Sequence, residues 1–301
     1  MYQTILPIAF AACASHAFAQ VQTVSLTPAA DTSLFQNSPL GDHVSNGTGA
    51  WLHVGLTNSW GERRPLLRFN LASRIPSNAT ITSVSLRVNV DRASGGGAVP
   101  LRVNVVPVLS SWTPGNVNSG GAEGTGGVAG EGDSTWFFRS YSATPANRVP
   151  WTPGGDLSSS NVSVATMTAL GDYTFGASSS FIALVQGWVT NPQSNFGIAL
   201  VPRTDQGGVA RRIRSSESAS SKPTLTVQYT LPPCDIDFNN DTLFPSDDDL
   251  IEFLNVLAGG TCSTEPPAGA GCDDIDINND GLFPLDDDLV AFLNALAGAP
   301  C

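Results

Sequence analysis

The chain contains few of the residues on which most catalytic and metal-thiolate sites depend. It has three histidines and five cysteines among 301 residues, and no two cysteines form a C-x-x-C pair, which argues against a zinc site. His43 and His53 lie ten positions apart, and no serine stands in the nucleophile-elbow context of a hydrolase. The acidic residues outside the C-terminal tail form no recognisable pair of the kind that a glycosidase needs. We therefore expect that the protein is not an enzyme.

Basic residues are absent from the C-terminal tail. Residues 234–301 carry 15 Asp and Glu and no Lys or Arg, so the residues before them carry 11 acids and all 14 bases of the chain. The net charge of −12 therefore belongs to the tail, because the rest is near neutral at +3. This balance predicts neither nucleic-acid binding nor a basic patch for membrane surfaces.

A long apolar stretch occurs only at the start of the chain. Residues 1–19 end in Ala17-Phe18-Ala19, the small-residue cleavage pattern of a secretory signal peptide. An alternative, lipidation at Cys13, rests on a distant likeness of residues 10–13 to a lipobox. No other run approaches the roughly 18 apolar residues of a membrane span. We expect export to the cell surface or the extracellular space.

The tail is one unit used twice. The segment DIDFNNDTLFPSDDDLIEFLNVLAGG (235–260) returns 39 positions later as DIDINNDGLFPLDDDLVAFLNALAGA. In each copy, short oxygen donors recur at alternate positions, which is the ligand spacing of a calcium loop. The predicted ligands are Asp237, Asn239, Asp241, the Leu243 carbonyl and Asp248 in the first loop, and Asp276, Asn278, Asp280, the Leu282 carbonyl and Asp287 in the second. If each loop is one residue longer, Asp249 and Asp288 close the sites instead.

An amphipathic helix is predicted after each loop. Apolar residues follow at helical spacing, and Gly259 and Gly298 are stop signals. The apolar residues are Leu250, Phe253, Leu254 and Leu257, then Leu289, Phe292, Leu293 and Leu296. The sharp turn of the loop favours Gly281 over Thr242, so we expect the second site to be tighter.

Residues 234–301 resemble the dockerin family, in which paired calcium loops are each followed by one helix. The resemblance implies Ca²⁺ as the bound ion and a surface docking protein as a partner. The alternatives are a metal-free helical pair and a disordered acidic tail. Four cysteines flank the repeats, Cys234 and Cys262 around the first and Cys272 and Cys301 around the second. Three pairings are possible, and we favour the two within-repeat bridges, each worth roughly 3–4 kcal/mol by chain entropy.

Residues 20–231 show the alternation of half-buried strands. Strands are predicted at 22–27, 50–55, 65–71, 84–90, 101–105, 162–167, 173–176, 195–201, 208–216 and 223–230, separated by Gly, Pro, Asn and Ser. One stripe, Phe181, Leu184, Val185 and Trp188, predicts a helix capped by Ser179 or Ser180. The expected fold is mainly β, an antiparallel β-sandwich or jelly roll, with a small helical calcium-loop domain at 232–301.

Phrases in the sandwich resemble a known family as well. RPLLRFNLASRIPSNATITSVSLRVNV, TWFFRSY, WTPGGDL, VQGWVTNPQSNFGIALV and RRIRSSES are similar to successive motifs of DNRLRE domains, β-sandwich modules related to a carbohydrate-binding module family associated with alginate-degrading proteins. The resemblance spans about 22–230 and implies a non-catalytic module on a secreted protein.

Aromatic rings are the first candidates for contact with a sugar. We select Trp60, which precedes Arg63 and Arg64, and the pair Trp112 and Trp151, which flank the glycine-rich loop 114–133. The alternative for each tryptophan is a ring that anchors a loop in the core. Arg63 and Arg64 would suit a uronic-acid carboxylate through bidentate bonds, and their alternative is a solvated surface position.

Two functions fit these observations. The first is a secreted module that binds a polysaccharide, with uronic-acid-rich chains among the candidates, while its calcium repeats dock or stabilise it. The second is a structural surface or matrix protein in which the sandwich is a spacer and the repeats mediate assembly.

Overall fold

The computed structural model describes residues 21–59, 61–94, 99–120, 124–204, 206–231, 237–239, 246–261, 275–277 and 286–297. Its contacts divide the chain into two compact units, of which one is Val21–Thr230 and the other holds the described residues from Leu231 onward. The predicted signal peptide (1–19) and the cysteines Cys234, Cys262, Cys272 and Cys301 lie outside the described residues.

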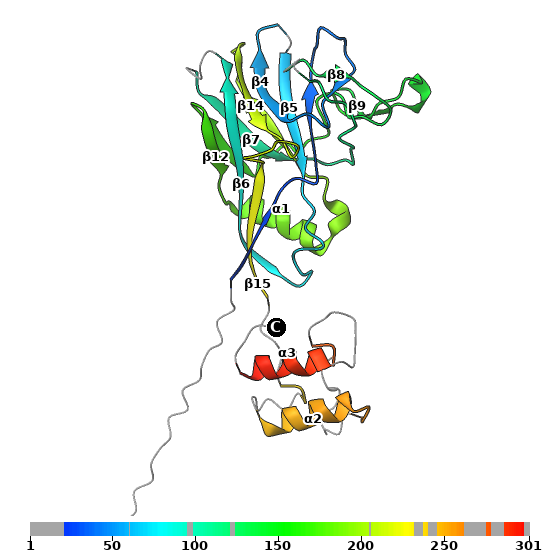
Figure 1. Ribbon diagram of the computed structural model, residues 1–301, viewed down its shortest axis with the longest axis vertical. Helices are drawn as coiled ribbons and strands as arrows, with labels where there is room; N and C mark the ends of the chain where they lie inside the picture. Colours follow the sequence, from blue (N-terminus) through cyan, green and yellow to red (C-terminus); the bar gives the residue numbers. More distant parts are fainter. Residues whose placement is uncertain are drawn as a thin grey trace, which may run out of the picture. The chain divides into compact units, whose positions relative to one another are not determined.

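Eleven strands of the first unit form one large, curled sheet (Figure 1). They are β1 (Gln22–Leu26), β2 (Ala30–Phe35), β4 (Trp51–Thr57), β5 (Gly61–Arg68), β6 (Thr80–Ala93), β7 (Leu101–Pro107), β11 (Ser163–Met167), β12 (Gly171–Phe175), β13 (Ile198–Arg203), β14 (Val209–Arg214) and β15 (Thr224–Thr230). Their order is β1-β15-β6-β14-β4-β5-β13-β7-β11, with β12 also paired to β6 and β2 to β5. Each of these pairings is antiparallel. The predicted mainly antiparallel β fold is confirmed.

Alternation along the strands builds the core. In β6, Val84, Leu86 and Val88 are fully buried, whereas Ser85 and Arg87 between them are only half-buried. The same period-2 pattern gives β14 its buried and half-buried faces. Side chains that point to one face of a strand are two residues apart, so these sequences place an apolar face inside the curled sheet.

Two short ribbons lie beside the main sheet. One pairs β3 (Val44–Ser45) with β8 (Gly127–Val128), and the other pairs β9 (Phe138–Ser140) with β10 (Val149–Pro150). Strand β8 lies within the glycine-rich loop predicted at 114–133. A buried carboxylate ties the described parts of this loop together, because Asp133 accepts hydrogen bonds from the backbone N–H groups of Asn116 and Gly130 at 3.1 and 3.0 Å.

The helix predicted around Phe181 is α1 (Ser179–Thr190). Its buried side chains are Phe181, Val185, Trp188 and Val189. Gln186 fastens the helix to β6, because its side chain accepts a hydrogen bond from the Ile81 N–H at 2.9 Å and donates one to the Ala79 carbonyl at 3.0 Å. The amide thus satisfies two backbone groups at the strand's beginning.

Both predicted alternatives for the cap of this helix, Ser179 and Ser180, were wrong. The cap is Ser178, whose Oγ accepts a hydrogen bond from the Phe181 N–H at 3.0 Å. A capping residue needs an extended backbone, which Ser178 has with φ −142° and ψ 160°. Ser179 and Ser180 are already inside the helix.

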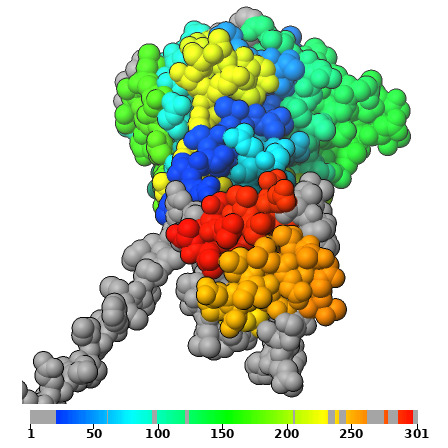
Figure 2. Space-filling model, turned by 60° about the horizontal axis from the view of Figure 1, so that its bottom comes forward, coloured from blue at the N-terminus to red at the C-terminus, as the bar shows by residue number. Residues whose placement is uncertain are grey.

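The second unit contains α2 (Asp247–Leu257) and α3 (Asp286–Leu296), one helix after each acidic loop as predicted. Phe253 of α2 stacks on its repeat counterpart Phe292 of α3, with ring centroids 4.3 Å apart and planes 15° apart. Phe238 packs edge-on against both rings. The two helices lie side by side, orange and red in Figure 2, so the duplicated sequence closes around one small aromatic core.

No helix in the described part of the chain has both the length and the apolar character needed to span a membrane.

Candidate functional site

Basic residues from three adjacent strands lie next to one another on the sheet. Arg212 of β14 lies opposite His53 of β4 on one side and opposite Arg92 of β6 on the other. Arg214 follows two residues after Arg212, so it shares that face of β14. We call His53, Arg92, Arg212 and Arg214 the basic row.

A β-bulge aims a carboxylate into the basic row. Arg212 pairs with Arg92 but Ile213 pairs with Val90, so Asp91 is an extra residue on β6. Such a bulge re-directs side chains relative to a regular ladder. The Asp91 carboxylate accepts two hydrogen bonds from Arg212, at 2.7 and 3.1 Å, and lies 3.0 Å from Nε of Arg214. Its side chain is only 11% exposed, so one largely buried carboxylate holds two guanidinium groups in place.

Trp51 completes this arrangement. Its Nε1 donates a hydrogen bond to Asp91 at 3.0 Å, and the Arg212 guanidinium lies 4.4 Å from the centre of its ring. Trp51 is half-buried at the start of β4. An indole ring therefore lies beside the basic row, and Asp91 joins it to two of the guanidinium groups of the row, those of Arg212 and Arg214.

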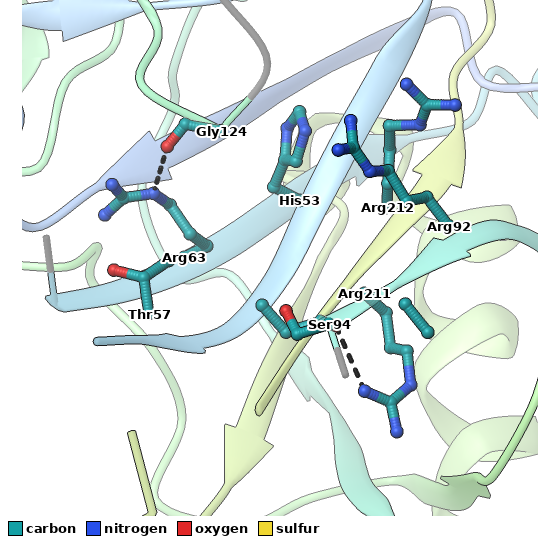
Figure 3. Close-up of a pocket in the computed structure, with 10 residues that line it drawn as sticks. His53, Thr57, Arg63, Arg92, Ser94, Gly124, Arg211 and Arg212 are labelled. Carbon is teal, nitrogen blue, oxygen red and sulfur yellow. Dashed lines mark hydrogen bonds between the residues drawn. The ribbon is translucent and has the colours of Figure 1, made fainter. Parts of the chain in front are cut away.

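A cavity of about 370 Å³ opens beside the basic row. The described residues around it include His53, Arg63, Arg92, Arg211 and Arg212, and none of those described is acidic. Figure 3 shows Arg92 and Arg212 on the same side of the sheet as His53, with Arg211 pointing the other way. The charged side chains described around the cavity are therefore all arginines.

Arg211 belongs to the core rather than to this site. It is 1% exposed, and its guanidinium donates to the carbonyls of Ala210 and Met167 at 3.0 and 3.1 Å. Burial lowers the pKa of Arg211 below its ordinary value. Its positive charge contributes to the electrostatic field around the cavity, while its hydrogen bonds satisfy backbone carbonyl groups in the core.

The structure separates the two arginines that were predicted to act together. Arg63 is fully buried, with its guanidinium 5.0 Å from the centre of the Phe35 ring and its Nε donating to the Gly124 carbonyl at 2.8 Å. Burial lowers the pKa of Arg63 to about 10. Arg64 lies on the other face of β5, where it pairs with Glu62 at 2.5 Å and covers Trp136. Of the two, only Arg63 lines the cavity, and neither is a solvated surface residue.

The predicted tryptophans Trp112 and Trp151 are core residues, 3% and 7% exposed, in a cluster with Trp136. The indole N–H of Trp112 donates to the Phe196 carbonyl at 2.7 Å, and that of Trp151 donates to the Trp136 carbonyl at 3.1 Å. The two rings therefore fit the alternative given for them, rings that anchor loops in the core, because rings buried in this way present no open face to a sugar. Trp60 lies outside the described residues.

No protein-family model and no curated protein matches the chain. Among solved structures, a pentamer of Israel acute paralysis virus is similar over 76% of this chain and 80% of that chain, at 13% identity and a TM-score of 0.19. A TM-score this low establishes no shared architecture.

The helical unit supplies the second candidate site. Of the predicted ligands, Asp237, Asn239, Asp248, Asp276 and Asp287 are described, while Asp241, Leu243, Asn278, Asp280 and Leu282 lie outside the described residues. By themselves, the described residues bring no three His, Cys, Asp or Glu side chains together that could hold a metal. A complete site would therefore need donors from the rest of each loop.

Burial distinguishes the two possible closing ligands of each loop. Asp249 and Asp288 are fully buried, whereas Asp248 and Asp287 are exposed. Asp249 accepts hydrogen bonds from N–H and Oγ of Ser246 at 3.0 and 2.8 Å, and its other oxygen faces the Asn239 N–H at 3.5 Å. It therefore reaches back to the start of the first loop, which favours the longer of the two registers. The tail has no Lys or Arg, so a hard cation is a fitting counter-charge for these carboxylates.

Proposed function

We propose that this is a secreted, non-catalytic protein whose sandwich binds an anionic polysaccharide of the uronic-acid type at the basic row. The observation that carries the proposal is the row itself, with three guanidinium groups and an imidazole on adjacent strands beside a cavity whose described lining residues include no acid. Guanidinium groups bind carboxylates through paired, charge-assisted hydrogen bonds. Trp51 offers a half-buried aromatic surface next to them, as sugar sites commonly do.

Asp91 makes the proposed site rigid. A guanidinium held by a neighbouring carboxylate loses less rotational freedom when a ligand arrives, and this lowers the entropic cost of binding. Arg92 extends outward from the same bulge and is exposed. It is therefore the side chain of the row that can meet a polymer with the least rearrangement.

Affinity electrophoresis of the full chain tests this function. Gels that contain alginate or pectin are expected to retard the protein, whereas gels with xylan are not. Added salt should reduce the retardation, because screening weakens exposed charge pairs. Absence of retardation by every polymer would support the alternative, a structural protein whose sandwich is a spacer.

Arg92→Ala is expected to weaken binding to alginate about tenfold, the equivalent of one lost charge-assisted hydrogen bond. The matched control is Arg102→Ala, which removes the same charge from an exposed position on β7 of the same sheet. Arg102 lies away from the basic row in the strand order, so its loss should change affinity less than about twofold. Equal effects of the two substitutions would indicate non-specific attraction by net charge.

For the helical unit we propose that each acidic loop binds one Ca²⁺, with Asp249 and Asp288 closing the two sites. Asp237, Asn239 and Asp276 are the other described candidates for ligands. Calcium would neutralise carboxylates that otherwise repel one another, and so stabilise the fold of the unit. Docking to a partner protein on the cell surface is the role that we propose for this unit.

A further inference from the structure

One buried carboxyl group in the sandwich is not a member of the basic row. Asp31 of β2 is 1% exposed. Its Oδ2 accepts a hydrogen bond from the Ser216 N–H at 2.7 Å, and its Oδ1 has no hydrogen-bond donor among the described residues. An ionised carboxylate buried in this way is unstable without a counter-charge or a second donor.

Glu217 lies next to this carboxyl group. Its Oε1 accepts a hydrogen bond from Oγ of Ser216 at 2.9 Å, so one serine bonds both acids. Because both acids bond the same serine, their carboxyl groups lie close together. Burial, and then the charge of Glu217, raises the pKa of Asp31 to about 7.

No cation offsets this pair within the described residues. Neither acid is part of an ion pair, and Glu217 is the charged group that acts on Asp31. The other groups that bond Asp31 belong to the neutral Ser216. Two neighbouring carboxylates, one of them buried, cannot both stay ionised at low energetic cost, and a shared proton resolves the conflict.

We propose that Asp31 and Glu217 share one proton, and that this proton latches the turn Ser215–Ser218 onto the sheet. In the latched form the Asp31 carboxyl O–H donates to the Glu217 carboxylate, and the proton leaves to water when the latch opens. The turn is otherwise held by serine side chains, since Ser215 donates to the Gly49 carbonyl at 2.7 Å and Ser218 to that of Ala50. The turn directly follows Arg214, and Ala50 directly precedes Trp51, so the latch borders the basic row. The proposal does not depend on the ligand proposed for that row.

The sign of the pH effect follows from the raised pKa. An acid whose pKa is higher in the closed form binds more protons there, so closure is favoured at low pH and weakens as pH rises from about 4 to about 7. If Asp31 regains its ordinary pKa when the turn opens, the opening equilibrium should increase about tenfold between pH 6 and 8.5.

Hydrogen exchange of the full chain at the Ser216 and Glu217 amides tests the proposal, after correction for the intrinsic pH dependence of exchange. The wild type should show the tenfold loss of protection. Asp31→Asn should abolish that dependence, because its amide can donate to Glu217 at every pH. Glu217→Gln, at an exposed position, should reduce the dependence even if Asp31→Asn fails to fold.

Two outcomes would overturn the latch. The first is pH-dependent protection in both variants equal to that of the wild type. The second is recovery of protection at pH 8.5 on adding calcium to the wild type but not to Asp31→Asn, since this would mean that a cation rather than a proton joins the two acids.

Discussion

Asp91→Asn is expected to lower the free energy of unfolding of the sandwich by about 2–4 kcal/mol. The carboxylate of Asp91 is shared by Arg212, Arg214 and the indole N–H of Trp51. An amide in its place removes the negative charge and turns an NH₂ group toward other N–H donors. Loss of one partner from a largely buried ion pair is strongly destabilising, because the remaining charges are left without compensation. Urea denaturation followed by tryptophan fluorescence measures the change.

Asp172→Asn is the matched control for this experiment. Asp172 pairs with Arg87 on the same sheet at 3.0 Å, but the two side chains are 50% and 43% exposed. Exposed pairs contribute under about 1 kcal/mol, so this variant should unfold almost like the wild type. A larger effect at Asp172 than at Asp91 would contradict the role that burial gives to Asp91.

The second large effect is expected in the helical unit. The double variant Asp249→Asn with Asp288→Asn should lose most of the calcium-induced rise in thermal stability. A ligand that binds only the folded form stabilises it by about 2.7 kcal/mol per site at a hundredfold excess over its Kd. Circular dichroism of the helices in the full chain, with calcium or with sodium at equal ionic strength, measures the shift.

The control removes the neighbouring carboxylates instead. Asp248→Asn with Asp287→Asn deletes the same number of charges from the same helix turns, but these side chains are exposed. We expect this variant to retain the calcium response. Loss of the response in the control and not in the first variant would show that the shorter register is the correct one, and an unresponsive wild type would contradict calcium binding altogether.

Strands with regular alternation were predictable from the sequence. Strand β6 is the clearest, since buried and half-buried residues alternate through the predicted range 84–90, although the strand itself is longer at both ends. Strand β2 was missed because all six of its residues are buried and three are polar. Asp31 and Ser33 point inward and use hydrogen bonds in place of apolar contact. A strand of this kind has no apolar period for a sequence pattern to detect.

The basic row was missed for a different reason. Arg212 and Arg214 are two residues apart in a predicted strand, and from this spacing the sequence could have predicted that they share one face. Their partners Arg92 and His53, however, are distant in the sequence and reach them only through strand pairing, and Arg92 does so across a bulge. Arginines next to each other in sequence, such as Arg63 and Arg64, fall on opposite faces of a strand.

The sequence alone does not distinguish the possible closing aspartates of each loop, because three aspartates are consecutive in both copies. In α2, Ser246 forms a capping box with Asp249, which orients that aspartate. The second copy has Leu285 in place of Ser246, yet Asp288 is also fully buried.

The pairing of β1 with β15 determines how the sandwich would respond to tension. Gln22 lies opposite Tyr229 and Leu26 opposite Leu225, so the chain enters and leaves the sandwich at the same end of this pair. A force applied at these two ends of the sandwich would break the hydrogen bonds between β1 and β15 one after another, beginning at Gln22 and Tyr229. Strand β1 would peel away at low force while β15 stayed paired with β6, and a tethered sandwich would lengthen by one strand before its core opened.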